Sequence, residues 1–403
     1  MTTEKINRIR AEMPVTEKVA YLNTGTSGPL PKRTVDTLTT ENTRQLTEGR
    51  ADMAGHMRLH SAKVELRQAF ADLTNASPAE IALTHHTTEG MNIVAHGLNL
   101  QPGDEVVTTT LEHEGGLLPL YILKQRRGIT VKTVELMNTT DDAEIVRRLE
   151  AAISPRTRLI LFSHVAWNTG QRLPLAEISA MARRHHVLTL VDAAQSVGAI
   201  PLDLPASGVD FYAMPGQKWL CGIEGTGALY IRRERLGMLS PTFVGYASLE
   251  LSSMYDYDGA FMLASGARRF EVGTVDRPGI YAMLANLRWM ADEVGWEWIF
   301  ERIAAMATLT FNALQSLPGV TVITPKAGQS GLITFQLDGY DPARVMTKLA
   351  QENIVIRFLP YPYALRVSTG FYNTEADIDR LVGALEDILS LNPDDLPEFV
   401  MPG

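Results

Sequence analysis

The chain has 403 residues, of which 45% are hydrophobic and 21% are charged, a composition typical of a globular protein with more than one hydrophobic core. Its net charge of −9 argues against binding to nucleic acid or anionic membranes, which requires a basic patch. Its single cysteine, Cys221, excludes an internal disulfide and a cysteine-rich metal site. Because no apolar run has the length of a signal peptide or membrane span, we expect a cytoplasmic protein.

Strand-like and helix-like segments alternate between residues 52 and 230. Helical periodicity predicts helices over 58–74, 141–153 and 175–186, and apolar runs predict strands over 104–113, 158–165 and 187–195. Alternating strands and helices form right-handed βαβ units. The sequence therefore predicts an α/β fold whose mostly parallel sheet is covered by helices on both faces.

The pattern changes after Gly279. Residues 279–316 are helix-rich with a break near Gly295, and beyond them the sequence predicts strands over 321–325, 331–337, 354–359 and 364–369 and helices over 343–352 and 374–390. This mixture indicates a smaller α+β domain. We expect a large domain over 22–278, a small domain over 279–392 joined by residues 1–21, and a loosely held tail over 393–403.

Polar side chains follow the predicted strands at the points where these strands end. They are His113, Asn168, Asp192, Gln195 and Lys218. In an open parallel sheet, ligands bind outside the carboxyl ends of the strands. The sequence therefore predicts that these five side chains gather at one edge of the sheet.

Each of these residue types has a task if the ligand is pyridoxal 5′-phosphate (PLP). Asp192 would pair with the pyridine nitrogen and keep the ring an electron acceptor, and Lys218 would reach the aldehyde and form an imine. Gln195 and Asn168 would contact the ring oxygen, and the imidazole of His113 would stack on the ring face. Each residue alone has a plainer interpretation, such as a turn or a solvated loop charge, and only their combination is specific.

A phosphate group requires free backbone amides at the start of a helix. Thr87 and Thr88 lie just ahead of a helix-like run in THHTTEGMNIVAHGL (84–98). We expect this helix start to bind the phosphate, with Thr88 adding its hydroxyl. The alternative is an ordinary helix N-cap.

Several segments together resemble the class V aminotransferase family of PLP enzymes. They are LNTGTSGPLP (22–31), THHTTEG (84–90), EHEGG (112–116), SHVAWNTGQRLPLAEI (163–178), VDAAQSVGAIPLD (191–203), GQKWLCGIEGTGALYIRRE (216–234), RRFEVGT (268–274) and LRVSTGFYNTEADI (365–378). The resemblance implies fold type I, with a seven-stranded, mostly parallel sheet in the large domain and a small C-terminal domain. It also implies a homodimer with active sites at the subunit interface.

The resemblance also assigns roles by matching position. It makes Lys218 the Schiff-base lysine and Thr274 a phosphate contact given by the neighbouring subunit. The cofactor contacts that it implies are Thr87, Thr88, His113, Asn168, Asp192, Gln195, Gln217 and Thr274, and the substrate contacts are Asn23, Gly25, Arg357 and Arg366. Arg366 would take the α-carboxylate, to which a planar guanidinium fork is suited. Arg357 would take a second, distal carboxylate or be a surface charge.

Two positions depart from the family pattern. The family usually has Ser or Thr three residues before the lysine and His directly before it, whereas this chain has Pro215 and Gln217. One hydroxyl contact to the phosphate is lost, and Gln217 replaces an imidazole only in part. The departures affect the phosphate site and leave the prediction for Lys218 unchanged.

Within the family, SHVAWNTGQRLPLAEI (163–178), RRFEVGT (268–274) and the pair of Arg357 and Arg366 resemble the cysteine and cystine C–S lyases. The resemblance implies β-elimination that yields pyruvate and ammonia, which is the reaction that we expect first. The alternatives are an aminotransferase, an isopenicillin N epimerase-like racemase, and a selenocysteine or hercynylcysteine sulfoxide lyase. A cysteine desulfurase is disfavoured, because it needs a mobile cysteine in the C-terminal third and no cysteine follows Cys221. A non-catalytic PLP-binding protein is a weaker alternative. A metal hydrolase is another, but the histidine pairs and HMRLH (56–60) lack a zinc-site pattern, so we expect no metal.

Overall fold

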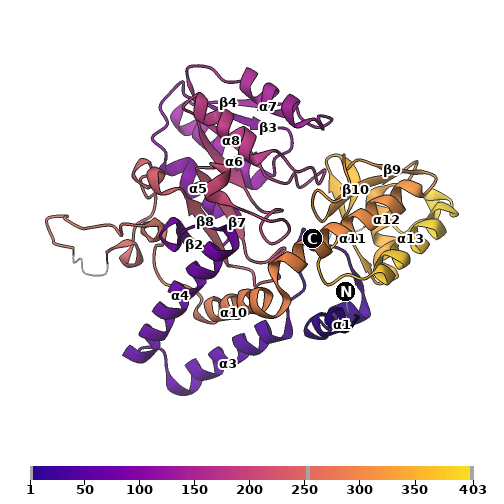
Figure 1. Ribbon diagram of the computed structural model, residues 1–403, viewed down its shortest axis with the longest axis horizontal. Coiled ribbons are helices and arrows are strands. Elements are labelled where there is room, and N and C mark those ends of the chain that lie inside the picture. The colour runs from indigo at the N-terminus through magenta and orange to yellow at the C-terminus, as the bar shows by residue number, and fades with distance from the viewer. Residues whose placement is uncertain (1–2, 251–254, 400–403) are drawn as a thin grey trace.

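The computed structural model describes residues 3–250 and 255–399, and within them the strands form three sheets (Figure 1). Residues 1–2 and 400–403, which belong to the predicted terminal segments, lie outside the described residues. A seven-stranded sheet with its helices makes up one side of the molecule. A four-stranded sheet with helices α11 to α13 makes up the other side (Figure 1).

The large sheet has the strand order β2-β8-β7-β6-β5-β3-β4. Its strands are β2 (Ile81–Thr84), β3 (Glu105–Thr109), β4 (Thr130–Val134), β5 (Thr157–Ser163), β6 (Leu188–Asp192), β7 (Phe211–Pro215) and β8 (Gly227–Ile231). Strands β4, β3, β5, β6 and β7 are parallel, and β8 runs antiparallel to both of its neighbours. The prediction of a mostly parallel seven-stranded sheet is confirmed.

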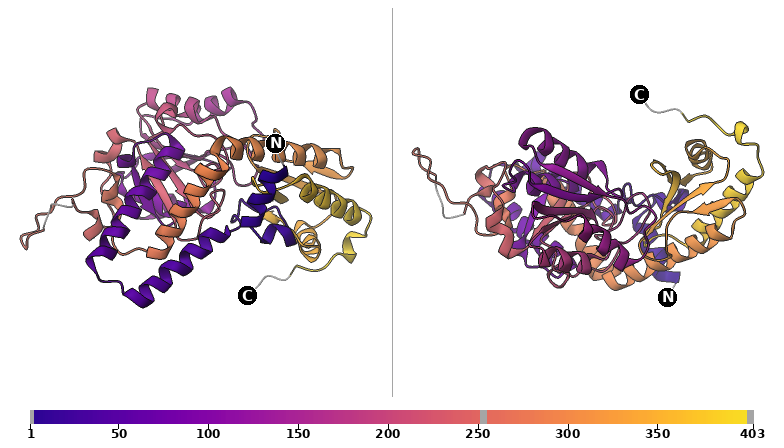
Figure 2. Two further views of the ribbon diagram at one scale, coloured as in Figure 1. Left: turned by 60° about the horizontal axis from the view of Figure 1, so that its bottom comes forward. Right: turned by 90° about the horizontal axis from the view of Figure 1, so that it is seen from above.

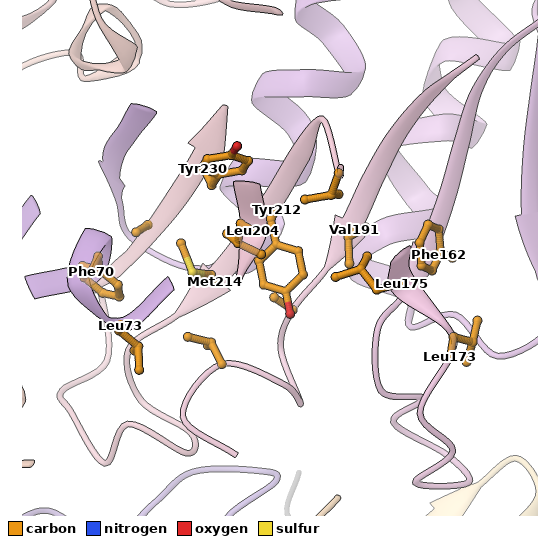
Figure 3. Close-up of a cluster of buried hydrophobic side chains, with 14 of the residues drawn as sticks. Phe70, Leu73, Phe162, Leu173, Leu175, Val191, Leu204, Tyr212, Met214 and Tyr230 are labelled. Carbon is orange, nitrogen blue, oxygen red and sulfur yellow. The ribbon is translucent and has the colours of Figure 1, made fainter. Parts of the chain in front are cut away.

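Both faces of this sheet are buried because successive residues of its strands are apolar. In β5, Ile160 and Phe162 pack into one core cluster, and Leu159 and Leu161 pack into the other. Figure 3 shows part of the first cluster, which extends from Phe70 of helix α4 across Met214, Tyr212, Val191 and Phe162 of neighbouring strands. The helices of this part are α3 (Lys32–Glu48), α4 (Met53–Thr74), α5 (Thr87–Gly97), α6 (Glu114–Arg127), α7 (Asp142–Ala151), α8 (Leu175–Arg184), α9 (Leu204–Ser207) and α10 (Arg277–Arg288).

The small sheet is antiparallel, with the strand order β12-β13-β10-β9. Its strands are β9 (Val320–Val322), β10 (Leu332–Leu337), β12 (Arg357–Pro360) and β13 (Tyr363–Ser368), and its helices are α11 (Trp296–Ser316), α12 (Pro342–Gln351) and α13 (Glu375–Leu389). Apolar residues of the sheet and helices, among them Phe335, Leu365 and Leu381, form a separate core.

The N-terminal segment packs on the small part (Figure 2). It contains α1 (Thr3–Glu12), α2 (Val15–Lys18) and β1 (Ala20–Tyr21), and β1 pairs in parallel with β11 (Ile354–Val355). Arg10 forms an ion pair of 2.9 Å with the buried Asp377 at the start of α13. Chain segments from the two ends of the sequence therefore share one core.

The predicted break near Gly295 is confirmed. The chain forms a π-helical turn (η5, Trp289–Val294) after α10, and Gly295 then adopts φ 86°, a left-handed conformation that favours glycine. The expected domain boundary at Gly279 falls inside α10, whose residues Met283 and Leu287 pack into the core of the large sheet. The 3₁₀ turns are η1 (Pro78–Glu80), η2 (Arg233–Met238), η3 (Tyr246–Ser248), η4 (Ala267–Phe270) and η6 (Pro393–Asp395).

Two strands are shorter than the sequence predicted. The run 104–113 is a strand only to Thr109, and the run 187–195 is a strand only to Asp192. In both places the side chain of the last residue accepts a backbone N–H two residues further on, from Leu111 to Thr109 and from Ala194 to Asp192. These local hydrogen bonds turn the chain out of the sheet at the ends of β3 and β6, where polar residues follow.

After β5, a hairpin over residues 165–172 packs against the small sheet. Val165 and Arg172 form its bridge, and Gly170 turns it at φ 72°. A Cβ at Gly170 would lie 2.5 Å from the carbonyl oxygen of Leu332 in β10, so only glycine allows this approach. The hydroxyl of Ser330 donates to the carbonyl oxygen of Gly170 at 3.0 Å.

Among the described residues, no helix is long and apolar enough to cross a membrane. The cytoplasmic location expected from the sequence stays a prediction.

The contact between α5 and β7 depends on Gly90, where a Cβ would lie 2.8 Å from the Cβ of Ala213. We predict that Gly90→Ala displaces α5 from the sheet and lowers the free energy of unfolding by about 1–3 kcal/mol, measured by urea denaturation. Gly383→Ala in α13 is the matched control, because no atom lies within 4 Å of the added Cβ. It should be neutral or stabilising by up to about 1 kcal/mol. Equal destabilisation by both substitutions would contradict the prediction.

Candidate active site

Asp192 and Lys218 lie at the carboxyl ends of β6 and β7, where the sequence placed them. Asp192 is the last residue of β6 and is buried, and its Oδ1 accepts the backbone N–H of Ala194 at 2.8 Å. Lys218 follows β7 and keeps part of its surface accessible. Burial of its ammonium lowers the pKa of Lys218 to about 8, with Asp192 opposing the shift and Arg366 and Arg357 adding to it. The lysine therefore has an unusually large fraction of free amine near neutral pH.

His113 begins helix α6 at the same edge of the sheet. Its Nδ1 accepts the backbone N–H of Gly115 at 3.0 Å, which makes it the N-cap of the helix. The ring of Trp167 stands edge-to-face against it, with ring centroids 5.2 Å apart. Burial, and then the charge of Lys218, lowers the pKa of His113. The imidazole is therefore neutral at neutral pH and is fixed in orientation on two sides.

Gln195 and Asn168 are both buried but differ in their partners. The amide Nε2 of Gln195 donates to the carbonyl oxygen of Gly25 at 2.8 Å, and its Oε1 accepts the indole N–H of Trp219 at 2.9 Å. One N–H of Gln195 remains for a ligand. Asn168 has a buried Oδ1 with no hydrogen-bond partner among the described residues. A buried polar atom without a partner is costly, so this atom indicates a ligand site.

The phosphate-binding expectation needs a correction in register. Thr87 and Thr88 do not precede helix α5 but form its first turn, because His86 is the N-cap and its Nδ1 accepts the backbone N–H of Glu89 at 3.1 Å. The hydroxyl of Thr87 is buried without a partner in the described part of the chain. A Cβ at Gly115 would lie 2.6 Å from Thr88 Oγ1, so the starts of α5 and α6 lie against each other. The two helix starts form a cradle of backbone amides.

The segment before Lys218 contributes one further free polar atom. The Oε1 of Gln217 is buried and has no hydrogen-bond partner in the described ranges, while its backbone carbonyl accepts the N–H of Gly28 at 2.8 Å. Pro215 is the last residue of β7 and pairs with Gly227 of β8. The sheet thus accommodates Pro215, whereas Gln217 lies beyond the end of β7.

Two arginines face each other on adjacent strands of the small sheet. Arg357 of β12 is the direct cross-strand partner of Arg366 of β13, and both contact the hydroxyl of Thr26 at 3.4 Å. Arg366 is buried and donates to the carbonyl oxygen of Trp167 at 2.8 Å, while its Nε has no partner. Neither arginine forms an ion pair with any residue of 3–250 or 255–399.

Like charges placed directly across a sheet repel each other. Burial, and then the charge of Arg357, lowers the pKa of Arg366 to about 9. Burial also lowers the pKa of Arg357. Two buried cations placed so close together gain free energy when an anion binds between or beside the two guanidinium groups. The arrangement indicates a site for a negatively charged ligand.

The segment after β1 lies beneath the arginine pair. Asn23 forms a bridge with Ser368, and its Oδ1 accepts the hydroxyl of Thr26 at 2.8 Å. A Cβ at Gly25 would lie 3.1 Å from Arg366 Nη2 and 2.8 Å from Ser368 Oγ. Glycine at this position therefore lets the backbone approach the buried guanidinium. Both residues lie where the sequence analysis expected substrate contacts.

Thr274 does not join this cluster within the chain. It is exposed, and its hydroxyl contacts the hydroxyl of the exposed Tyr246 at 3.3 Å. In the described residues no hydrogen bond connects Thr274 with Lys218, Asp192 or the arginines. The predicted contribution from a neighbouring subunit is compatible with this position and stays a prediction.

The sequence analysis missed three residues that shape the site. Trp167 packs against His113 and accepts from Arg366, and Thr26 contacts both arginines. Glu112 is buried next to His113 and is bonded to two hydroxyl groups. The one available signal for Glu112 was a carboxylate directly before His113 in EHEGG.

The residues present fit PLP. The arrangement provides a carboxylate, a lysine with a lowered pKa, a fixed neutral imidazole, unpaired buried amide and hydroxyl groups, and a cradle of helix N-termini. Such a site on the carboxyl edge of a seven-stranded, mostly parallel sheet defines a PLP-dependent enzyme of fold type I.

The family model "Aminotransferase class-V" matches residues 20–381, and the chain belongs to this PLP-dependent family. Among similar proteins, an isopenicillin N epimerase of Streptomyces clavuligerus is 33% identical over 394 residues, covering 94% of this chain and 96% of that protein. A probable cysteine desulfurase of Methanothermobacter thermautotrophicus is 30% identical over 412 residues, covering 97% and 99%.

Solved structures of C-DES, a cystine C–S lyase, are also similar. A lysine-to-alanine mutant with glycine covalently linked to its PLP cofactor has a TM-score of 0.89 and 33% identity, covering 94% of this chain and 99% of that chain. The complex with the reaction product cysteine persulfide has a TM-score of 0.88 and 33% identity, covering 93% and 99%. The fold, the cofactor and the enzymatic nature predicted from the sequence are confirmed.

Proposed function

We propose that this enzyme is a C–S lyase that removes sulfur from cystine or a related S-substituted cysteine with two carboxylates. The observation that carries the proposal is the cross-strand pair of Arg357 and Arg366, two half-buried to buried cations without a carboxylate partner among the described residues. Cystine carries one carboxylate at each end, so it can neutralise both arginines. The similarity to C-DES supports the same substrate class.

The roles proposed for the cofactor site rest on the residue types present and on the family resemblance. Lys218 would hold PLP covalently, Asp192 would pair with the pyridine nitrogen, and His113 would stack on the ring. Asn168 and Gln195 would contact the ring oxygen, and Thr87, Thr88 and Gln217 would contact the phosphate. When bound, PLP supplies an electron-accepting ring conjugated to the substrate Cα.

The chain's own residues carry out the proton transfer. Arg366 holds the α-carboxylate and Arg357 the distal one, so the Cα–H bond is oriented toward Lys218. The substrate amine would replace the amine of Lys218 on the cofactor and thereby free Nζ. The free amine Nζ would then remove the Cα proton, which its lowered pKa favours. The Cβ–S bond then breaks, and the sulfur leaves with its electron pair as a persulfide. Hydrolysis of the remaining enamine gives pyruvate and ammonia.

Cysteine desulfurases are among the similar proteins, so likeness alone does not favour elimination over desulfuration. The position of Cys221 supplies the argument. Its side chain is buried, and a Cβ at Gly28 would lie 2.7 Å from its Sγ, so it is tightly packed. Burial raises the pKa of its thiol. A buried neutral thiol is unsuited to attack a substrate sulfur.

Epimerisation is the second candidate, because the similarity to an isopenicillin N epimerase covers 94% of this chain at 33% identity. An epimerase needs an acid on the face of Cα opposite Lys218. Transamination and the selenocysteine and hercynylcysteine sulfoxide lyase reactions use the same set of residues. The reaction products distinguish all of these alternatives.

We also propose a homodimer in which Thr274 contributes to the neighbouring active site. The described residues 243–250 and 255–262 project from the body of the molecule (Figures 1 and 2). They expose large apolar side chains, which include Phe243, Tyr246, Tyr257 and Phe261. Exposed apolar side chains of this size are typical of a surface that a second subunit covers.

In the wild type, we expect a visible absorbance band, and borohydride reduction should fix the cofactor to one peptide. We predict that Lys218→Ala lacks this band and that its kcat is more than about a thousandfold lower, because covalent attachment and proton transfer both depend on this amine. The assay incubates each protein with cystine and quantifies pyruvate, ammonia and persulfide. Alanine as the product would instead support desulfuration. Racemised substrate without a new product would support the epimerase, and a keto acid that requires an amino acceptor would support a transaminase.

We predict that Cys221→Ser keeps kcat for cystine within about threefold of the wild type, because the thiol has no chemical role in elimination. The buried hydroxyl costs stability, so thermal unfolding of the variant is measured alongside. Loss of sulfur transfer in a variant that remains folded and binds PLP would contradict the assignment and favour a persulfide mechanism.

We predict that Arg357→Met raises KM for cystine by about tenfold or more, because a charge-assisted contact to the distal carboxylate is lost. The same variant should unfold at a higher temperature in the absence of substrate, since the repulsion with Arg366 is removed. An S-alkylcysteine without a distal carboxylate is the control substrate, and its KM should not change. A similar rise in KM for both substrates would contradict the role given to Arg357.

A further inference from the structure

Glu112 is a carboxyl group buried beside the cofactor site. It lies in the turn between β3 and α6, directly before His113, and is 7% exposed. Its Oε1 accepts the hydroxyl of Thr109 at 2.6 Å, and its Oε2 accepts the hydroxyl of Ser163 at 2.7 Å. Within the described ranges no lysine, arginine or histidine forms an ion pair with it. The carboxyl group is held in place without a counter-charge.

Ser163 connects this carboxyl group to Asp192. Ser163 is the last residue of β5 and is in register with Asp192, the last residue of the parallel strand β6. Residues in register on parallel strands project to the same face, with the strands about 4.8 Å apart. Glu112 is therefore bonded to the side chain that lies beside Asp192 on the neighbouring strand.

We propose that Glu112 is a positioning residue that acts together with Asp192. The ionisation of Glu112 sets how much negative charge lies beside the pyridine end of the cofactor site. This inference rests on the proposed pairing of Asp192 with the pyridine nitrogen. Protonated Glu112 leaves Asp192 as the one nearby negative charge. Ionised Glu112 adds a second, which strengthens the hold on a protonated ring by roughly tenfold.

The pKa of Glu112 supports this geometry. Burial raises it to about 7, its two hydroxyl partners lower it, and the charge of Asp192 raises it further. The group is therefore neutral at pH 5.5 and ionised at pH 8.5. Three further charged groups around the site shift the pKa of the neighbouring His113. They are Lys218 after β7, Glu114 of α6 and Arg357 of β12.

The test measures how fast the holoenzyme loses its cofactor on dilution, followed by the decay of its visible absorbance. Glu112→Gln mimics the protonated side chain at every pH. At pH 5.5 it should release the cofactor within twofold of the wild-type rate, and at pH 8.5 on the order of tenfold faster. Because other titrations are common to both proteins, the ratio of their rates isolates Glu112. A ratio that is the same at both pH values overturns the proposal.

Glu114→Gln is the matched control, since this neighbouring carboxylate is exposed, and its ratio to the wild type should not differ between the two pH values. Ser163→Ala provides a second variant in case Glu112→Gln does not fold. It removes a hydrogen bond to the ionised carboxylate, so its release rate should exceed the wild-type rate most strongly between pH 7 and 8. A ratio for Ser163→Ala without this maximum also overturns the proposal.

Failure of this inference is distinguishable from failure of the proposed function. Asp192→Asn holoenzyme should lose its cofactor faster than the wild type at both pH values. If it does and the ratio for Glu112→Gln is flat, the role of Glu112 is wrong and that of Asp192 stands. If Asp192→Asn has no effect, the pairing of Asp192 with the ring is wrong.

Discussion

The carboxyl ends of parallel strands meet at one edge of a sheet, and the site of this enzyme depends on that constraint. Strands β3, β5, β6 and β7 end within a few residues of one another in register. At the ends of β3 and β6, a side chain accepts a backbone N–H and turns the chain out of the sheet, as Thr109 does with Leu111 and Asp192 with Ala194. The sheet supplies rigidity, and the short turns supply chemical groups, so polar side chains from distant parts of the sequence reach fixed positions.

The second half of the site comes from the small sheet, and its charge balance differs from that of the first. The cofactor side contains carboxyl groups at Asp192 and Glu112, whereas the substrate side contains the arginine pair. The chain thus keeps two buried to half-buried cations apart from a region with buried acid groups. In the proposed function, this separation would orient an amino acid with its carboxylates toward the small sheet and its amine toward the large one.

Much of this arrangement could be predicted from the sequence. Strand ends are recognisable from apolar runs followed by polar residues, and therefore Asp192, Lys218, His113 and Asn168 were found at the correct edge. Helix starts were harder to predict, because an imidazole rarely caps a helix. His86 is the N-cap of α5, so Thr87 and Thr88 lie in its first turn and not ahead of it. Such a cap depends on a side-chain rotamer and not on periodicity.

The contacts made by Trp167, Thr26 and Glu112 could not be predicted. Trp167 and Thr26 act through partners that are about 200 to 340 positions away in the chain, and nothing local marks them. The pairing of Arg357 with Arg366 depends on the register of β12 and β13. The sequence predicted both strands but not which of their residues lie opposite each other. Gln195 was correctly placed, yet the partners of its amide, Gly25 and Trp219, come from tertiary packing.

The hairpin over residues 165–172 has a mechanical consequence. The carbonyl oxygen of Trp167 accepts from the buried guanidinium of Arg366, and the next residue, Asn168, has a buried Oδ1 without a partner among the described residues and is the proposed contact of the ring oxygen. The far end of the hairpin is fastened to the small sheet through Gly170 and Ser330. The hairpin therefore works as a fixed spacer between the two halves of the enzyme. A rotation of the small part would move Arg366 and Asn168 together. The distance between the proposed carboxylate contact and the proposed ring contact would therefore stay the same during such a motion.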